Sequence, residues 1–226
     1  MFKYILFDLD GTLTDPKLGI TSCVQYALRA LGIEEPDLDK LEPFIGPPLK
    51  DSFMEFYGFS EEQTKKAIDK YHERFDEKGI YENEIYPGIA AMLGALKNNG
   101  SKLSIASSKP TPLVERVLEH FDIKQYFDYI VGSNLDGTRS RKEEVVEEAL
   151  RQMIPSGLTQ AERKAAVAMV GDRRFDVEGA KAHGLTSIGV SFGYAPEGEL
   201  EQAGADYIVG TVEELYHVLN GGFDEQ

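Results

Sequence analysis

Short runs of apolar residues alternate along most of the chain with segments whose apolar positions recur at helical spacing. The apolar runs predict buried strands at residues 4–7, 102–106, 129–131, 166–170, 187–190 and 207–209. Helical patterns follow several of them, at residues 112–120, 142–153, 177–183 and 212–219. Strands that alternate with helices predict an α/β fold, a doubly wound, Rossmann-like parallel sheet covered by helices on both faces.

One long segment breaks this alternation. Between residues 17 and 80 no stretch reads as a strand, whereas residues 20–31 and 61–75 carry apolar residues at helical spacing. Turn sequences that suit hinges flank the segment, Asp15-Pro16 before it and Tyr86-Pro87-Gly88 after it. We therefore predict an all-helical cap at 16–84, inserted into an α/β catalytic core formed by 1–15 and 85–226.

Charge and composition narrow the possible partners. The formal net charge is −15, and so acidic a surface repels the phosphates of nucleic acid and of anionic membranes. A small anionic substrate then needs a local positive site, such as a lysine or a metal ion. The single cysteine, Cys23, allows no intrachain disulfide and is compatible with a reducing compartment. The N-terminal apolar run is too short for a signal peptide or a membrane span, so we expect a cytoplasmic protein. We also expect it to be a monomer or a homodimer.

Polar residues follow several of the predicted strands. In a doubly wound sheet, ligands bind beyond the carboxyl ends of the strands, so these residues are candidates for chemistry. Asp8 and Asp10 follow the first predicted strand, Ser107 the second and Asp172 a later one, while Lys142 opens a helix. Two close carboxylates repel each other, and a divalent cation between them removes that cost. Carboxylates, a hydroxyl group and an amine are the groups that phosphoryl transfer uses.

These residues lie in four ordered motifs that resemble those of the haloacid dehalogenase-like hydrolase superfamily. The first is Asp8-Leu9-Asp10-Gly11-Thr12, the second ends at Ser107, the third contains Lys142, and the fourth runs from Gly171 to Asp176. The predicted insertion resembles the helical cap of that superfamily. Within the superfamily the chain is similar to phosphoglycolate phosphatases and to related small-molecule phosphatases, including 5′-nucleotidases.

The resemblance implies a Mg²⁺-dependent phosphomonoester hydrolase acting on a small phosphorylated metabolite, phosphoglycolate or a nucleoside 5′-monophosphate. Asp8 would attack phosphorus and form an aspartyl-phosphate, and Asp10 would protonate the leaving group and then activate a water molecule. Lys142 and Mg²⁺ would face the phosphoryl charge. The carboxylates of Asp8 and Asp172 and the backbone carbonyl of Asp10 would bind the metal, while Asp176 would hold a metal-bound water or orient Lys142.

The phosphoryl oxygens are expected to contact Ser107 and Ser108 and the first-motif residues Gly11 and Thr12. The two serines have a second interpretation, as N-caps of the helix that follows Pro110. Both interpretations are compatible with the sequence.

Other charged residues also have alternatives. Asp176 is suited to the start of a helix, where a negative charge is favourable. Lys109 and Arg141 compete with Lys142 as the cation that faces the phosphoryl group. The stretch Asn134–Thr138 repeats part of the first motif, but an asparagine stands in place of the nucleophile, so we interpret it as a loop turn.

Substrate choice is expected to lie in the cap. Its Gly46-Pro47-Pro48 turn is either the rigid start of a helix or a loop that faces the active site. Lys50 is our candidate for binding a second anionic group of the substrate. The aromatic residues Phe53, Phe56 and Tyr57 either pack inside the cap or offer a surface to a base.

Three other functions compete with a phosphatase. A phosphomutase of the same fold would keep its aspartyl-phosphate from water, and assays with hexose phosphates would reveal it. A non-catalytic protein that binds a phospho-ligand would be expected to lack some of the carboxylates, yet Asp8, Asp10, Asp172 and Asp176 are all present. A dehalogenase needs no second aspartate at the position of Asp10, so the presence of Asp10 argues against that function.

Overall fold

The computed structural model describes residues 1–154 and 157–222, and these divide into two compact units. Unit 1 consists of Met1–Leu13 and Ile85–Gln226, and unit 2 of Thr14–Glu84. The sequence predicts the first boundary between residues 15 and 16, whereas the two units divide between Leu13 and Thr14. Residues 155–156 and 223–226 of the predicted core lie outside the described residues.

Unit 1 is built on a six-stranded parallel sheet with the strand order β5-β4-β1-β6-β7-β8. The central strand β1 is fully buried and pairs with β4 on one side and β6 on the other. The predicted fold class is thereby confirmed. The strands are β1 (Tyr4–Phe7), β4 (Lys102–Pro110), β5 (Tyr129–Ser133), β6 (Val167–Gly171), β7 (Thr186–Val190) and β8 (Tyr207–Val209).

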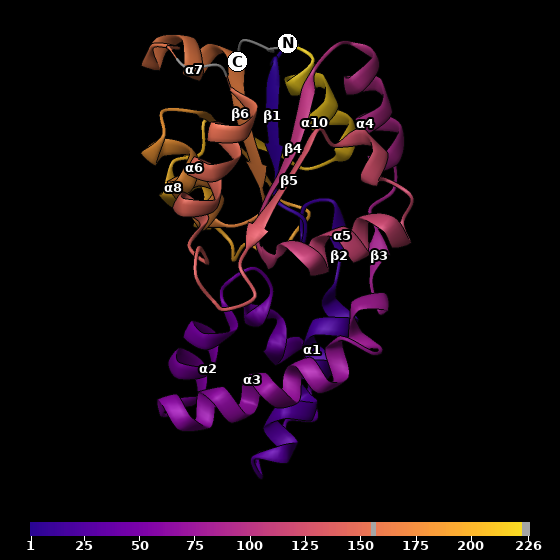
Figure 1. Ribbon diagram of the computed structural model, residues 1–226, viewed down its shortest axis with the longest axis vertical. Helices are drawn as coiled ribbons and strands as arrows, with labels where there is room; N and C mark the ends of the chain where they lie inside the picture. The colour runs from indigo at the N-terminus through magenta and orange to yellow at the C-terminus, as the bar shows by residue number, and fades with distance from the viewer. Residues whose placement is uncertain (155–156, 223–226) are drawn as a thin grey trace. The chain divides into compact units, whose positions relative to one another are not determined.

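Helices cover both faces of this sheet. Figure 1 shows α6 and α8 on one face and α4 and α10 on the other. The inner side of α6 carries Val145, Val146 and Ala149, which pack in one apolar cluster with Leu6 and Met169 of the sheet. The helices of unit 1 are α4 (Ile89–Asn98), α5 (Thr111–His120), α6 (Lys142–Met153), α7 (Gln160–Ala166), α8 (Arg174–Ala182), α9 (Glu199–Ala203) and α10 (Val212–Leu219), with a short 3₁₀ turn η3 at Lys124–Tyr126.

Strand β4 is longer than its apolar run predicts. It continues through Ser107 and Ser108 to Pro110, and its register with β5 shifts between Ala106 and Pro110. Ser107 therefore lies within the strand and not after it. Pro110 is the N-cap of α5, with no side-chain capping bond. The interpretation of the two serines as N-caps of that helix is wrong, because the extended backbone carries them away from its first turn.

Unit 2 is helical, as its apolar spacing predicts. Residues 17–80, all of which the structure describes, contain no strand. Helix α3 begins with a reciprocal capping box between Ser60 and Gln63, which satisfies two N–H groups at its start. Strands β2 (Thr14–Asp15) and β3 (Glu84–Ile85) pair where the chain enters and leaves the unit. The helices are α1 (Lys17–Ala30), α2 (Leu49–Tyr57) and α3 (Glu61–Phe75), with 3₁₀ segments η1 (Leu38–Phe44) and η2 (Gly79–Tyr81).

An aromatic cluster forms part of the core of unit 2. Phe53 is fully buried, with its ring centroid 4.9 Å from that of Phe44 and 5.8 Å from that of Phe59, on which it stacks. Tyr57 lies beside the same two rings and is half-buried. Phe56 is 43% exposed. Phe53 thus packs inside the unit, whereas Phe56 and Tyr57 keep exposed surface.

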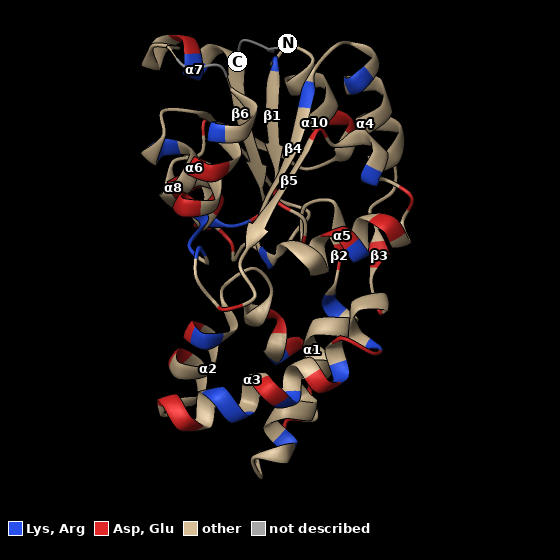
Figure 2. Ribbon diagram, viewed as in Figure 1, with Lys and Arg blue, Asp and Glu red and all other residues tan. Residues whose placement is uncertain are grey.

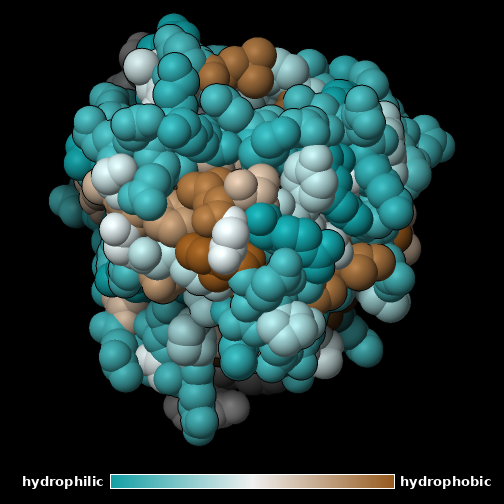
Figure 3. Space-filling model, turned by 90° about the horizontal axis from the view of Figure 1, so that it is seen from below, coloured by the Kyte–Doolittle hydropathy of each residue, from teal (hydrophilic) through white to brown (hydrophobic). Residues whose placement is uncertain are grey.

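The surface is rich in charge of both signs. Figure 2 shows acidic residues on most helices, with basic residues interspersed among them. On α3 these form ion pairs one turn apart, Lys66 with Glu62 at 2.8 Å and Lys70 with Glu73 at 2.6 Å. In the face shown in Figure 3, hydrophobic residues occur as limited groups among hydrophilic ones. Across the described ranges, no helix combines the length and the apolar character that crossing a membrane requires.

Candidate active site

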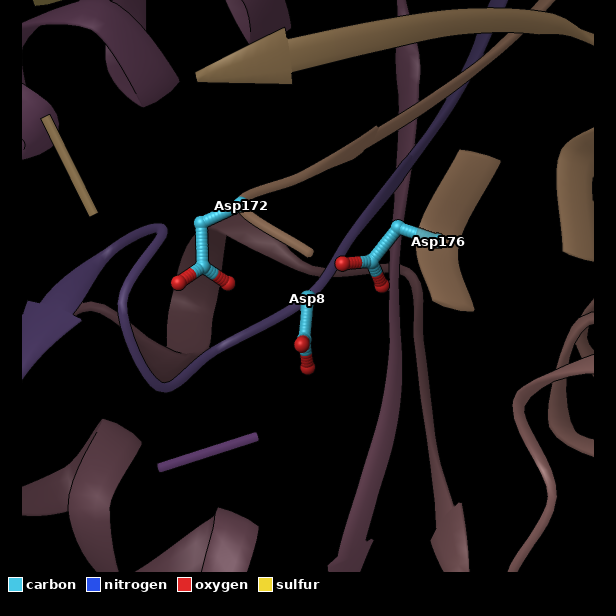
Figure 4. A group of neighbouring side chains, drawn as sticks. All are labelled: Asp8, Asp172 and Asp176. Carbon is cyan, nitrogen blue, oxygen red and sulfur yellow. The ribbon is translucent and has the colours of Figure 1, made fainter. Parts of the chain in front are cut away.

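Three buried aspartates gather at the carboxyl ends of β1 and β6. Asp8 directly follows β1, Asp172 follows β6, and Asp176 lies in the first turn of α8. One carboxylate oxygen from each lies within 4.8 Å of the others. Figure 4 shows the three side chains converging from their separate backbone segments. The parallel sheet brings these residues together because neighbouring strands end at the same edge.

Lys142 joins this cluster from the first turn of α6. Its Nζ lies 2.9 Å from Oδ2 of Asp8 and 2.8 Å from Oδ1 of Asp176, and it donates a 3.0 Å hydrogen bond to the carbonyl oxygen of Ala106. Two carboxylate oxygens and one carbonyl oxygen thus surround the ammonium group. The side chain of Lys142 is 5% exposed and that of its neighbour Arg141 75%. The helix therefore directs Lys142, and not Arg141, to the aspartates.

The charges in the cluster do not balance. Burial raises the pKa of Asp172 well above its ordinary value, and the charges of Asp176 and Asp8 raise it further. Burial also raises the pKa of Asp176 to about 6, against the opposing effect of Lys142. For Lys142 burial lowers the pKa, but the carboxylates of Asp176 and Asp8 outweigh it and raise the pKa above its ordinary value. Three carboxylates facing one ammonium group form a donor set that fits a divalent metal ion.

Backbone packed closely around Asp172 fixes its carboxylate. Its Oδ2 accepts a 2.8 Å hydrogen bond from the N–H of Tyr194, and its Oδ1 lies 3.5 Å from the hydroxyl oxygen of Thr12. Gly193 approaches so closely that a Cβ there would lie 2.4 Å from the Cβ of Asp172. Gly11 crowds the same side chain from the first motif. The structure thus places Gly11 and Thr12 against Asp172; contact of either with substrate stays a prediction.

Asp176 combines two of the roles considered for it. Its Oδ2 accepts a 3.0 Å hydrogen bond from the N–H of Arg173, which caps α8, while its Oδ1 faces Lys142. The strand end leaves room for this side chain because residue 171 is glycine: a Cβ at Gly171 would lie 2.0 Å from Cγ of Asp176. The carboxylate therefore both starts the helix and orients the lysine.

A second buried ion pair joins the first and second motifs. Lys109 Nζ lies 2.5 Å from Oδ2 of Asp10, and the N–H of Lys109 donates a 3.3 Å hydrogen bond to Oγ of Ser107. Ser107 is buried and Ser108 half-buried. From the sequence, Lys109 is only an alternative to Lys142, but the two lysines pair with different aspartates: Lys109 with Asp10, and Lys142 with Asp8 and Asp176.

The repeat of the first motif at Asn134–Thr138 forms a loop turn, as predicted. The Asp136 carboxylate accepts hydrogen bonds from the N–H and the hydroxyl of Thr138, and Gly137 adopts a φ of +82°. The turn closes on itself through backbone hydrogen bonds between Asn134 and Thr138 and between Gly137 and Asn134.

The candidate specificity residues lie at the start of α2 in unit 2. Gly46 has a φ of +103° and Pro48 is the N-cap of α2, so the Gly46-Pro47-Pro48 turn does begin a helix. Lys50 lies in the first turn of that helix, with its side chain 59% exposed and its Nζ 3.8 Å from Oε1 of Glu61. Its role in substrate binding stays a prediction.

Sequence reasoning missed several residues that support the site. Glu199 of α9 accepts from Nε of Arg173 at 2.9 Å and from the N–H of Arg174 at 2.9 Å, and so braces the fourth motif. Tyr194 acts through its backbone N–H, which leaves no signal in residue type. Gly193 has a signal in its residue type, because only glycine fits so close to Asp172, but its partner is distant in the sequence. The glutamate has a local signal, because it stands at the start of a short helix, but its partner is 26 residues away.

Comparison with known proteins identifies a family for this chain. A family model described as haloacid dehalogenase-like hydrolase matches residues 5–190. The chain is 47% identical to a 5′-nucleotidase of Pseudomonas aeruginosa over 88% of this chain and 87% of that protein. It is 35% identical to the tyrosine-protein kinase PtkA of Mycobacterium tuberculosis over 96% of this chain and 72% of that one.

A phosphoglycolate phosphatase of Escherichia coli is 28% identical over 95% of this chain and 91% of its own length. Among solved structures, that of a predicted phosphatase from Clostridium acetobutylicum matches with a TM-score of 0.90 and 46% identity, covering 97% of this chain and 99% of that one.

Proposed function

The chain belongs to the haloacid dehalogenase-like hydrolases, and from this premise we propose that it is a Mg²⁺-dependent phosphatase of small phosphorylated metabolites. The observation that carries the proposal is the contact of Lys142 with both Asp8 and Asp176 inside a cluster of three buried carboxylates. A buried nucleophile beside a buried cation is the arrangement that transfer of a negatively charged phosphoryl group requires.

Asp8 is the proposed nucleophile. Its Oδ1 accepts a 2.7 Å hydrogen bond from the N–H of Leu9, and its Oδ2 faces Lys142, so the carboxylate is held at both oxygens. Attack of this carboxylate on phosphorus forms an aspartyl-phosphate as the bond to the leaving oxygen breaks. Lys142 offsets the charge of the phosphoryl oxygens.

Asp10 is the proposed acid and base. It gives a proton to the leaving oxygen in the first step and takes one from the water that attacks the aspartyl-phosphate in the second. The side chain is buried at the carboxyl end of β1, beside the second motif. Ser107 and nearby backbone N–H groups hold the phosphoryl oxygens.

The carboxylates of Asp8 and Asp172 and the backbone carbonyl of Asp10 are the proposed Mg²⁺ ligands. Asp176 stays outside this set, because one of its oxygens caps α8 and the other faces Lys142. Mg²⁺ prefers oxygen ligands and keeps several waters, so few protein ligands suffice. When bound, the ion supplies positive charge that stabilises the transferring phosphoryl group.

Nucleoside 5′-monophosphates are the proposed substrate class, with phosphoglycolate as the alternative. The relative named 5′-nucleotidase is 47% identical, against 28% for the relative named phosphoglycolate phosphatase. The partly exposed rings of Phe56 and Tyr57 are compatible with a base.

Release of inorganic phosphate tests the proposal. Purified protein is assayed with nucleoside monophosphates, phosphoglycolate and hexose phosphates, with Mg²⁺ and with EDTA. We expect turnover of a monophosphate that EDTA abolishes and Mg²⁺ restores. Conversion of one hexose phosphate into another without phosphate release would indicate a phosphomutase instead, and binding without turnover of any substrate would indicate a non-catalytic protein.

A further inference from the structure

The two carboxylate oxygens of Asp10 have different surroundings. Oδ2 faces Nζ of Lys109 in a pair whose side chains are only 11% and 7% exposed. Oδ1 is also buried, yet no hydrogen-bond partner for it exists among the described residues. Buried carboxylate oxygens ordinarily accept hydrogen bonds, so an oxygen left without a donor inside a candidate active site marks a position for a group that the protein does not supply.

Lys109 reaches Asp10 because of two features of the sheet. Strands β1 and β4 are neighbours, with Phe7 opposite Ile105, so the residues beyond their ends lie at the same edge. The register shift in β4 comes after Ala106, where the extended backbone leads through Ser107 to Lys109. The same short segment therefore supplies a hydroxyl to the proposed phosphoryl site and a cation to Asp10.

We propose that Lys109 is a positioning residue that sets which oxygen of Asp10 exchanges the proton; this rests on the proposed function of Asp10 as acid and base. Lys109 holds Oδ2, so the carboxylate cannot rotate freely, and Oδ1 remains for the reacting oxygen. In the first step the proton passes from Oδ1 to the leaving oxygen as its bond to phosphorus breaks. In the second step Oδ1 takes a proton from a water molecule while the oxygen of that water bonds to phosphorus. The bond between phosphorus and the Asp8 carboxylate breaks at the same time, which releases Asp8.

This role differs from a purely structural one, in which the ion pair between Lys109 and Asp10 only stabilises the packing of β4 against the first motif. Loss of a purely structural pair would affect all substrates alike, because it would lower the fraction of correctly folded protein. A positioning role affects proton transfer, so its loss depends on the leaving group. Alkyl phosphates need protonation of the leaving oxygen, whereas aryl phosphates with acidic phenols need it much less.

The test compares Lys109→Met and Lys109→Arg with Asp10→Asn on one alkyl and one aryl phosphate, both at saturating Mg²⁺. We expect Lys109→Met to lower kcat for the alkyl phosphate about ten- to hundredfold and for the aryl phosphate less than threefold, roughly, with KM little changed. Lys109→Arg should recover part of the loss, because it keeps a cation. Lys102→Met, an exposed lysine at the opposite end of β4, is the matched control and should leave both rates unchanged.

The double variant Asp10→Asn/Lys109→Met separates the outcomes further. If Lys109 acts through Asp10, the double variant is no slower than Asp10→Asn alone, because the rate losses caused by substituting two residues that act together do not add. Equal losses on both phosphates, or additive losses in the double variant, overturn the role of Lys109. If Lys109→Met does not fold, Lys109→Arg is compared on the same two phosphates. A loss confined to the alkyl phosphate supports the role of Lys109, and equal losses overturn it.

Failure of the underlying function looks different. If Asp10→Asn itself shows equal losses on alkyl and aryl phosphates, Asp10 is not the acid and base, and the proposal for Lys109 falls with it. If Asp10→Asn shows the preference and neither Lys109 variant does, only the proposal for Lys109 is overturned.

Discussion

Gly11 touches Asp172 so closely that a Cβ on Gly11 would lie 2.1 Å from Oδ2 of the aspartate. The backbone of Gly11 also has a φ of +80°, a conformation that other residues rarely adopt. Two independent constraints, conformation and space, thus require glycine at this position of the first motif. The space matters for function because Asp172 is a proposed ligand of the metal.

Gly11→Ala is expected to lower activity at least about a hundredfold, since displacing a positioned group by about 1 Å has an effect of that size. The matched control is Gly32→Ala. Gly32 has nearly the same φ, +81°, but no atom within 4 Å of a Cβ built there. Gly32→Ala should therefore lower stability by about 1 kcal/mol through backbone strain and leave kcat/KM unchanged. Equal activity of the two variants would show that crowding at Asp172 has no functional role.

Asp8→Asn is expected to abolish turnover without unfolding the protein. The amide oxygen can still accept the hydrogen bond from Leu9, but a carboxamide cannot form an aspartyl-phosphate. The rate should fall by several orders of magnitude, as for other catalytic nucleophiles. Asp136→Asn, in the loop that repeats part of the first motif, is the control and should keep full activity. Phosphate release and the melting temperature are measured for both, and an active Asp8→Asn would refute the nucleophile.

The thermal effect of Mg²⁺ should depend on pH. The pKa of Asp176 is raised to about 6, so its contribution to the stability of the metal-free protein is present below about pH 4 and is lost as the pH rises through 6. The pKa of Asp172 is raised in the same direction by burial and by its carboxylate neighbours. Above about pH 6 the ionised carboxylates repel one another, and Mg²⁺ bound at the proposed ligands Asp8 and Asp172 would offset this repulsion. At a free Mg²⁺ concentration 100 times the Kd we expect about 2.7 kcal/mol of stabilisation, or roughly 5–10 °C in Tm.

Melting curves with Mg²⁺ or EDTA at pH 5.0 and pH 7.5 check this expectation. The shift caused by Mg²⁺ should be clearly larger at pH 7.5, and Asp172→Asn should reduce it. A shift of the same size at both pH values would contradict the assignment of the cluster as a metal site.

Variants in unit 2 distinguish the two substrate classes. If Lys50 binds a carboxylate of the substrate, Lys50→Ala should raise KM for phosphoglycolate about ten- to hundredfold, the equivalent of one charge-assisted hydrogen bond of about 1.5–3 kcal/mol, with little change for a substrate without a second anionic group. If a ring contacts a base, Tyr57→Ala should instead raise KM for a nucleoside monophosphate. Lys65→Ala, an exposed lysine of α3, is the control. No effect of Lys50→Ala on either substrate would exclude the anion-binding role.

The parts of the fold that could be predicted from the sequence are the helices and strands whose own apolar residues recur at a helical or strand spacing. Helices α3, α6 and α10 begin and end where their apolar spacing predicts, because each buries one continuous stripe. The end of β4 was not predictable, since Ser107 to Pro110 are neither apolar nor alternating and their extended form depends on pairing with β5.

The candidate site shows the same division. Asp8 and Lys142 were identified because motif position marks them. The pairing of Lys109 with Asp10 was not, because it joins residues 99 positions apart and requires that β1 and β4 be neighbours. The N–H of Tyr194 was equally hidden, since any residue type at that position supplies one. Contacts between residues distant in the sequence, and contacts made by backbone atoms, could not be predicted from this single sequence.

The central position of β1 in the sheet affects how the protein can fold during translation. Tyr4 pairs with Lys102 on one side and Val167 on the other. A growing chain therefore completes the whole of Thr14–Glu84, a contiguous helical unit, before either neighbour of β1 has left the ribosome. Unit 2 is able to form during that interval, whereas the apolar strand β1 waits unpaired, and unpaired apolar strands aggregate. Translation of the residues between β1 and β6 is thus the stage at which this apolar strand lacks at least one of the two neighbours that bury its backbone.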